Sequence, residues 1–287
     1  MSLNYKGMAG VSKMNVKKIK ELTGVMIAPC ILYLLAVMPR MVNRPDTGIF
    51  KRKYFAHRGL HDQESGVPEN SMAAFRRAVE AGYGMELDVQ VTKDGVPVVF
   101  HDFLLERMCG IGGRLEEYTY EELRQFKLGS SEERIPRLAE VLSMVNGQVP
   151  LIVEIKGEKA DVAFCGIIDR MLRAYKGEYC IESFNPMVLW WYRRHHRDVI
   201  RGQLASNFRL DGGYRNALYF FMTHLLLNFI TKPDFIAYNH RFMEEPGRRI
   251  CRRLYRNPSV AWTIKSRQEL EKMRDEFDVF IFEGFVP

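Results

Sequence analysis

Short apolar runs alternate with amphipathic helical patterns from Lys53 to the end of the 287-residue chain. This alternation indicates repeated βα units, whose strands pair in parallel because each helix returns the chain to the same end of the sheet. Eight runs have the length and composition of strands, which predicts an α/β fold whose sheet closes into a barrel. The predicted strands cover residues 54–56, 85–91, 96–100, 151–155, 177–183, 234–238, 259–263 and 279–282.

An uncharged stretch, Thr23–Pro39, precedes the barrel segment. Its length is at the lower limit for a membrane-spanning helix, and Pro29 would kink it. We therefore predict a hydrophobic anchor within residues 1–45, with a helix packed on the domain as the alternative. The five cysteines show no paired spacing, which favours free thiols and the cytoplasmic face of the membrane. Basic residues flank both ends of the stretch, so orientation is not fixed by charge.

Two further segments depart from the regular βα pattern. Residues 102–136 contain several glycines and form a predicted excursion above the barrel mouth. Residues 217–230 are apolar nearly all round but too short to span a bilayer, so they pack in the protein, self-associate or enter a membrane interface. The net charge of +7 favours anionic partners, and no motif indicates binding to nucleic acid.

Polar residues stand at regular positions in two of the predicted strands. Alternate residues of a strand share a face, so Glu86 and Asp88 point to one side of the sheet and Leu87 to the other. The apolar side fits against helices, which leaves the acidic side for the barrel interior. Glu154 and Lys156 repeat the pattern in a later strand, so three carboxylates and a lysine converge at strand ends, where such barrels hold their sites.

The turn between the strands at 85–91 and 96–100 is too short for a parallel crossover. The second strand therefore returns antiparallel. Two registers are considered for this hairpin, and they place His101 opposite either Glu86 or Asp88. Both put His101 about 5 Å from a carboxylate, measured between Cβ atoms.

Three buried carboxylates raise one another's pKa unless a cation lies between them. Ligation by oxygen alone suits Mg²⁺ or Ca²⁺ better than zinc. The alternative is a salt-bridge network with Lys156 and Arg58 that needs no metal. His57 and Arg58 at the end of the first strand favour the metal, because two histidines suit acid–base work and Arg58 and Lys156 suit a phosphate.

Six short motifs occur in a fixed order along the predicted strands and the loops that follow them. Any one alone is weak, because three residues match by chance in many proteins, whereas six in sequence are specific. The motifs are His57-Arg58-Gly59, Pro68-Glu69-Asn70-Ser71, Glu86-Leu87-Asp88, Lys93-Asp94-Gly95, His101-Asp102 and Glu154-Ile155-Lys156.

The order and spacing of these motifs resemble the glycerophosphodiester phosphodiesterase family. The similarity extends through Ser183-Phe184-Asn185 and Trp262-Thr263 to residue 287. The resemblance implies one TIM (β/α)8 barrel over residues 50–287, related to the phosphoinositide phospholipases C. It also implies hydrolysis of glycerophosphodiesters to glycerol 3-phosphate and an alcohol, with lysophospholipids as an alternative substrate that would leave lysophosphatidic acid. Family members usually close with an aspartate after the last strand, where this chain has Glu283.

The resemblance also assigns a role to each site residue. His57 and His101 are the implied acid and base, in an order that stays open. Arg58 and Lys156 contact the phosphate, and Glu69 reaches the glycerol or the metal. The implied ligands of the divalent metal are Glu86, Asp88 and Glu154.

Two other functions fit the same residues. One is a phospholipase of the phosphoinositide or sphingomyelinase D type on the same barrel. The other is a membrane-bound sensor that binds phosphodiesters without turnover. The leaving alcohol, the native metal and the oligomeric state stay open at this stage.

Overall fold

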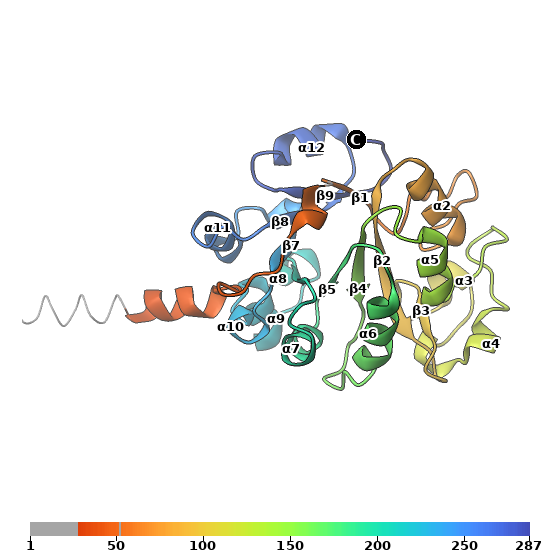
Figure 1. Cartoon of the computed structure of the whole chain (residues 1–287), viewed down its shortest axis with the longest axis horizontal. Coiled ribbons are helices and arrows are strands. Elements are labelled where there is room, and N and C mark those ends of the chain that lie inside the picture. The colour runs from red at the N-terminus through yellow and green to blue at the C-terminus, as the bar shows by residue number, and fades with distance from the viewer. Residues whose placement is uncertain (1–27, 52) are drawn as a thin grey trace, which may run out of the picture.

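The computed structural model describes residues 28–51 and 53–287 of the chain. Its parallel strands are β1 (Tyr54–Ala56), β2 (Gly84–Val91), β4 (Leu151–Ile155), β5 (Tyr179–Ser183), β6 (Arg201–Ala205), β7 (Phe235–Asn239), β8 (Ser259–Ile264) and β9 (Val279–Phe282). β1 pairs with β2 on one side and with β9 on the other, so the eight strands close into a barrel (Figure 1). The TIM-barrel prediction is confirmed.

The predicted set of barrel strands is wrong in one member. The predicted strand at 96–100 is β3 (Pro97–Val99), which returns antiparallel along β2 and does not belong to the parallel ring. The missing barrel strand is β6, whose sequence Arg-Gly-Gln-Leu-Ala has no apolar run. Its arginine is nevertheless buried, because Arg201 reaches Asp234 on the next segment. A Cβ at Gly202 would lie 2.1 Å from the Phe235 ring, so this position requires glycine.

Two apolar layers fix the orientation of the strands. One surrounds the barrel and packs side chains such as Leu87 and Val89 against the helices. The other includes Ile152, Phe235 and Ile281 from alternate positions of the strands. The predicted division of β2 into an apolar and an acidic face is therefore confirmed.

The helices cover the outside of the barrel (Figure 1). Several of them begin at side-chain caps; for example, the Ser71 hydroxyl accepts from Ala74 N at 3.1 Å, and Asn185 caps the helix that starts at Pro186. The α-helices of the barrel segment are α2 (Met72–Glu80), α3 (Glu106–Cys109), α4 (Tyr120–Leu123), α5 (Leu138–Val145), α6 (Cys165–Ala174), α7 (Pro186–His195), α8 (Phe208–Asp211), α9 (Ala217–Thr223), α10 (Asn228–Thr231), α11 (Pro246–Arg253) and α12 (Arg267–Met273). Short 3₁₀ turns are η1 (Gly48–Lys51), η2 (Leu115–Glu117) and η3 (His240–Phe242).

The segment 102–136 contains α3, η2 and α4 and has a small core of its own. Leu105, Met108, Leu115 and Leu123 pack there with side chains from β3 and its end. This separate core holds α3 in place, which matters because α3 carries a residue into the site.

Residues 28–37 at the start of the described chain are helical. The end of this helix is tied to the domain, since Tyr255 Oη donates to Leu34 O at 2.8 Å and Asn228 Nδ2 to Val37 O at 2.9 Å. The first part of the predicted anchor, residues 1–27, lies outside the described residues. Among the helices that the structure describes, none has both the length and the apolar character needed to cross a bilayer.

Candidate active site

The three predicted metal ligands meet inside the barrel. Glu86 and Asp88 lie on β2 and Glu154 on β4, with Asp88 directly beside Glu154 in the parallel register. One carboxylate oxygen of each lies within 4.8 Å of the others, and all three side chains are buried. The prediction that these residues share one inward face is confirmed.

The carboxylates of the cluster outnumber the lysine that pairs with them. Lys156 Nζ lies 2.9 Å from Asp88 Oδ1 and 2.8 Å from Glu154 Oε1, which gives two of the carboxylates a cationic partner. Burial, with the neighbouring charge of Asp88, still raises the pKa of Glu86 well above its usual value. Burial also raises the pKa of Glu154, despite Lys156. An oxygen-only donor set with excess negative charge fits a hard divalent cation such as Mg²⁺ or Ca²⁺.

A fourth carboxylate adjoins this cluster, and sequence reasoning missed it. Glu182 on β5 pairs in register with Glu154 and is 1% exposed. Its Oε2 has no hydrogen-bond partner among the described residues. Burial raises its pKa strongly, and the charges of Glu154 and Asp88 raise it further. The period of two in β5 placed Glu182 on the inward face, so the signal was present in the sequence.

His57 follows β1 and is held by Glu283, which directly follows β9. Its Nδ1 lies 2.7 Å from Glu283 Oε2, and its Nε2 lies 4.0 Å from Glu86 Oε2. A carboxylate only accepts, so the Nδ1 proton points to Glu283 and the free Nε2 faces the cluster. Burial lowers the pKa of His57 to about 4, although the hydrogen bond to Glu283 opposes this. Glu283 therefore occupies the place where the resemblance led us to expect an aspartate.

His101 has the same arrangement with a different partner. Its Nδ1 lies 2.6 Å from Asp102 Oδ1, and its side chain is 32% exposed. Both predicted registers of the hairpin are wrong. Val89 pairs with Val99, and this register lies midway between the two predicted ones, shifted by one residue from each. The ladder ends before His101, which the loop carries into the site. Although burial opposes it, the charges of Lys156 and of His101 in that position lower the pKa of Asp88.

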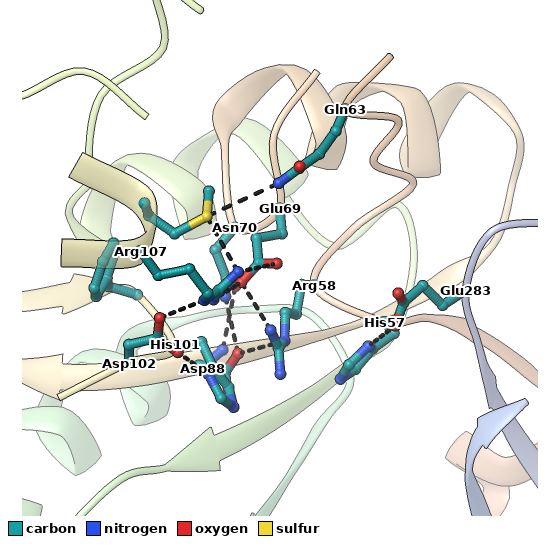
Figure 2. A network of polar contacts seen from close by, with 12 residues as sticks. His57, Arg58, Gln63, Glu69, Asn70, Asp88, His101, Asp102, Arg107 and Glu283 are labelled. Carbon is teal, nitrogen blue, oxygen red and sulfur yellow. Dashed lines mark hydrogen bonds and ion pairs between the residues drawn. The ribbon is translucent and has the colours of Figure 1, made fainter. Parts of the chain in front are cut away.

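A chain of ion pairs through Glu69 links Arg58, which follows β1, to Asp102 beside His101 (Figure 2). Arg58 Nη1 donates to Glu69 Oε1 at 2.7 Å, and Arg107 Nη2 donates to the same oxygen at 2.6 Å. Arg107 Nε also reaches Asp102 Oδ2 at 2.5 Å, so it supports the partner of His101. Glu69 thus lies between two guanidinium groups, outside the three-carboxylate cluster. Arg107 on α3 was not predicted, because nothing in its local sequence marks it.

Backbone conformation explains the residue types at Arg58, Gly59 and Asn70 in the first two motifs. Arg58 has φ +54°, which aims its N–H at Glu86 Oε2, 3.0 Å away. At Gly59 a Cβ would lie 2.9 Å from the backbone of Ala74, so only glycine fits against α2. Asn70, also with positive φ, donates from Nδ2 to Asp88 Oδ2 at 2.8 Å and orients that carboxylate.

These features define a TIM-barrel protein whose site suits a divalent cation and an anionic ligand, with two histidines backed by carboxylates. More specifically, the chain belongs to the glycerophosphoryl diester phosphodiesterase family, whose sequence profile matches residues 57–237.

Relatives of known name support this placement. A glycerophosphodiester phosphodiesterase from Caldanaerobacter subterraneus is 39% identical over 140 residues, which cover 46% of this chain and 56% of that protein. Human glycerophosphodiester phosphodiesterase 1 is 34% identical over 158 residues, 50% of this chain and 46% of that protein. The chain thus spans about half the length of the curated relatives it matches.

Solved structures show the same fold. A phosphodiesterase from Oleispira antarctica, in complex with the product sn-glycerol-3-phosphate, superposes with a TM-score of 0.65 at 22% identity over 80% of this chain and 92% of its own. A glycerophosphodiester phosphodiesterase from Thermotoga maritima has a TM-score of 0.62 at 24% identity over 80% and 93% of the two chains.

Proposed function

We propose that this chain hydrolyses glycerophosphodiesters to glycerol 3-phosphate and an alcohol in a reaction that needs a divalent cation. The observation that carries the proposal is the pair of histidines, His57 and His101, each held through Nδ1 by a carboxylate beside the three-carboxylate cluster. Histidines held through Nδ1 in this way leave Nε2 free to take or return a proton at a reacting oxygen.

The cation site would consist of Glu86, Asp88 and Glu154. When bound there, Mg²⁺ or Ca²⁺ would supply Lewis-acid polarisation of a phosphoryl oxygen. Lys156 and Arg58 add positive charge at the same end of the barrel, where a phosphate would otherwise meet only carboxylates.

In the proposed reaction the glycerol hydroxyl next to the phosphate attacks phosphorus, and the bond from phosphorus to the leaving alcohol breaks. One histidine accepts the hydroxyl proton, while the other donates a proton to the departing oxygen. Water then opens the cyclic phosphate with the two roles reversed. We assign the first base to His57, because its free Nε2 faces the carboxylate cluster, and the acid to His101, which is more exposed at the mouth.

The test is release of glycerol 3-phosphate from glycerophosphocholine with added Mg²⁺ or Ca²⁺. We expect turnover that a chelator abolishes and that His101→Ala reduces by about 10²–10⁴-fold. His195→Ala is the matched control, since His195 is exposed on α7 and contacts the backbone oxygen and the ring of Trp191 on its own helix. Tight binding of glycerophosphocholine without turnover in any cation would indicate the sensor instead.

A substrate panel separates the enzymatic alternatives. Choline released from lysophosphatidylcholine, with lysophosphatidic acid left, would extend the activity to lysophospholipids. Turnover of inositol phospholipids or sphingomyelin without turnover of glycerophosphocholine would instead favour the phospholipase function.

We also propose that the chain binds a membrane surface, with the barrel on the cytoplasmic side. Exposed apolar side chains on the helix at 28–37, Ile31, Leu32 and Leu35, support binding to a membrane surface, and Phe220 and Phe221 on α9 add a second exposed apolar group. The free thiols of the five cysteines support the cytoplasmic side. Liposome flotation of the full chain tests it. Replacing Ile31, Leu32 and Leu35 by aspartate should reduce the bound fraction several-fold, and unchanged flotation would contradict the proposal.

A further inference from the structure

A cavity of about 520 Å³ opens directly beside the carboxylate cluster. Glu154 and Lys156 line its charged end, so a ligand at the proposed reaction centre would extend into it. Its volume lies in the range of ligand pockets, about 300–1,000 Å³. Its other walls are aromatic and aliphatic and include Phe103, Phe184, Phe208, Tyr214, Leu218 and Tyr219.

The aromatic wall is a continuous chain of ring contacts. Phe184, directly after β5, lies 5.7 Å from Trp262 of β8 and 5.8 Å from Phe208 of α8, measured between ring centroids. Phe208 lies 5.2 Å from Tyr219 of α9, which stacks on Tyr214 at 4.4 Å. The wall therefore extends from Phe184 to the surface helices α8 and α9, and Trp262 supports it from behind through its contact with Phe184.

The segment that carries the outer wall is tied to the barrel. Asp211 Oδ2 at the end of α8 accepts from Ser206 Oγ at 2.8 Å and from Asn239 Nδ2 at 3.1 Å. Thr223 Oγ1 at the end of α9 accepts from Phe208 N at 3.2 Å, and Tyr238 Oη donates to Thr223 O at 2.9 Å. Both helices are thus fixed over the ends of β6 and β7, so the cavity is a preformed site.

The position of the cavity indicates which end of the substrate would lie in it. Phe184 and Phe208 follow β5 and β6, whereas Arg58 and Glu69 follow β1, which lies across the ring of eight strands. The esterified glycerol carries two free hydroxyl groups and fits the polar side around Glu69 and Arg107, so the leaving alcohol points into the cavity. This step rests on the proposed function.

The chemistry of the wall selects the alcohol. Leu218, Tyr219 and Met222 present hydrocarbon. At the charged end Glu154 is already paired with Lys156 at 2.8 Å, so a quaternary ammonium finds no free carboxylate there. The one other acidic side chain of the lining besides Glu154 is Glu158, which forms an ion pair with Arg114. An apolar chain is the ligand that meets no unfavourable charge there.

We propose that this cavity binds an apolar chain on the leaving alcohol, so that the preferred substrates are glycerophosphodiesters of chain-bearing alcohols. Each methylene buried is worth about fourfold in affinity. Even partial burial of an octyl chain should therefore favour its ester by about 100-fold over the ethyl ester.

The test compares the ethyl and n-octyl esters of glycerol 3-phosphate below the concentration at which the octyl ester aggregates. We expect kcat/KM to be about 100-fold higher for the octyl ester. Leu218→Asp and Tyr219→Ala should each reduce that preference to tenfold or less while the ethyl ester is turned over at the wild-type rate. Phe221→Asp is the control on the same helix, because Phe221 is exposed and does not line the cavity.

Calorimetric binding of both esters to the His101→Ala protein separates this inference from the proposed function. Tighter binding of the octyl ester that Leu218→Asp removes supports the cavity assignment even where no ester is turned over. Equal binding and equal turnover of the two esters would overturn it. A loss of glycerophosphocholine turnover in Tyr219→Ala, with the octyl preference unchanged, would overturn it in favour of a site for a cationic alcohol.

Discussion

The two sides of the barrel mouth differ in chemistry. The side formed by β1, β2 and β4 carries five titratable side chains, those of His57, Glu86, Asp88, Glu154 and Lys156. The side formed by the ends of β5, β6 and β8 carries rings, with Phe184, Phe208 and Trp262 in contact. The charged side can bind a cation and move protons, which is what phosphoryl transfer requires. For the aromatic side we propose selection of the leaving alcohol by shape and apolarity, so that the two sides divide reaction from specificity.

Removal of the cation tests the charged side most severely. We expect a chelator to lower kcat/KM by at least ~10³-fold, since a bound cation supplies several kcal/mol of transition-state stabilisation. The relative binding of octyl and ethyl esters should change by less than about threefold, because the cavity wall is apolar. Assays and calorimetry with and without chelator measure both. A chelator that abolished the chain preference would show that the two sides are not separable.

His57→Ala should have the next largest effect. Loss of an acid–base group typically costs about 10²–10⁴-fold, and the ethyl and octyl esters should lose the same factor. Steady-state kinetics with both esters measure this, with thermal melting to verify that the variant is folded. A loss specific to the octyl ester would place His57 in substrate selection.

Glu283→Gln should have a smaller effect, about 10–100-fold on kcat, because the histidine stays in place but its Nδ1 proton is no longer held by a charge. The hydrogen bond from His57 lowers the pKa of Glu283 to about 2, so the carboxylate is charged throughout any assay above pH 4. Glu283→Asp should restore part of the rate. Lys265→Gln is the control, since Lys265 is exposed and lies 3.3 Å from the other oxygen of Glu283. Equal losses in the Gln and Lys265 variants would contradict an orienting role.

The charged side could be predicted from sequence because its residues lie in short motifs on strands with a period of two. Glu86, Asp88 and Glu154 needed only that period and a parallel register to converge. The aromatic side could not be predicted in the same way. β6 is held by contacts across the chain, with Arg201 paired to Asp234 and Gly202 beneath Phe235, and such contacts leave no periodic apolar signal.

Two other features of the site also depend on contacts between distant parts of the chain, and sequence patterns did not predict them. Arg107 reaches Glu69 and Asp102 from a segment whose own small core positions it, so its role depends on tertiary packing. The register of the hairpin was off by one residue in both predicted forms, because turn length alone does not decide between neighbouring registers. Glu182 differs from Arg107 and from the hairpin register, because its inward position followed from the strand pattern. The structure was needed only to show that its Oε2 is buried without a hydrogen-bond partner among the described residues.

Glu182 lies between the two sides and gives the smallest expected effect. It is buried beside Glu154, and its Oε2 has no partner among the described residues. Burying an unpaired polar group costs about 1–3 kcal/mol, so Glu182→Leu should stabilise the cation-free protein by about that amount. The melting temperature in chelator should rise by about 2–6 °C, measured by differential scanning calorimetry. Glu182→Gln, which keeps the polar group, is the matched control and should not raise it. A lower melting temperature for the leucine variant would show that Glu182 stabilises the fold and belongs to the charged side.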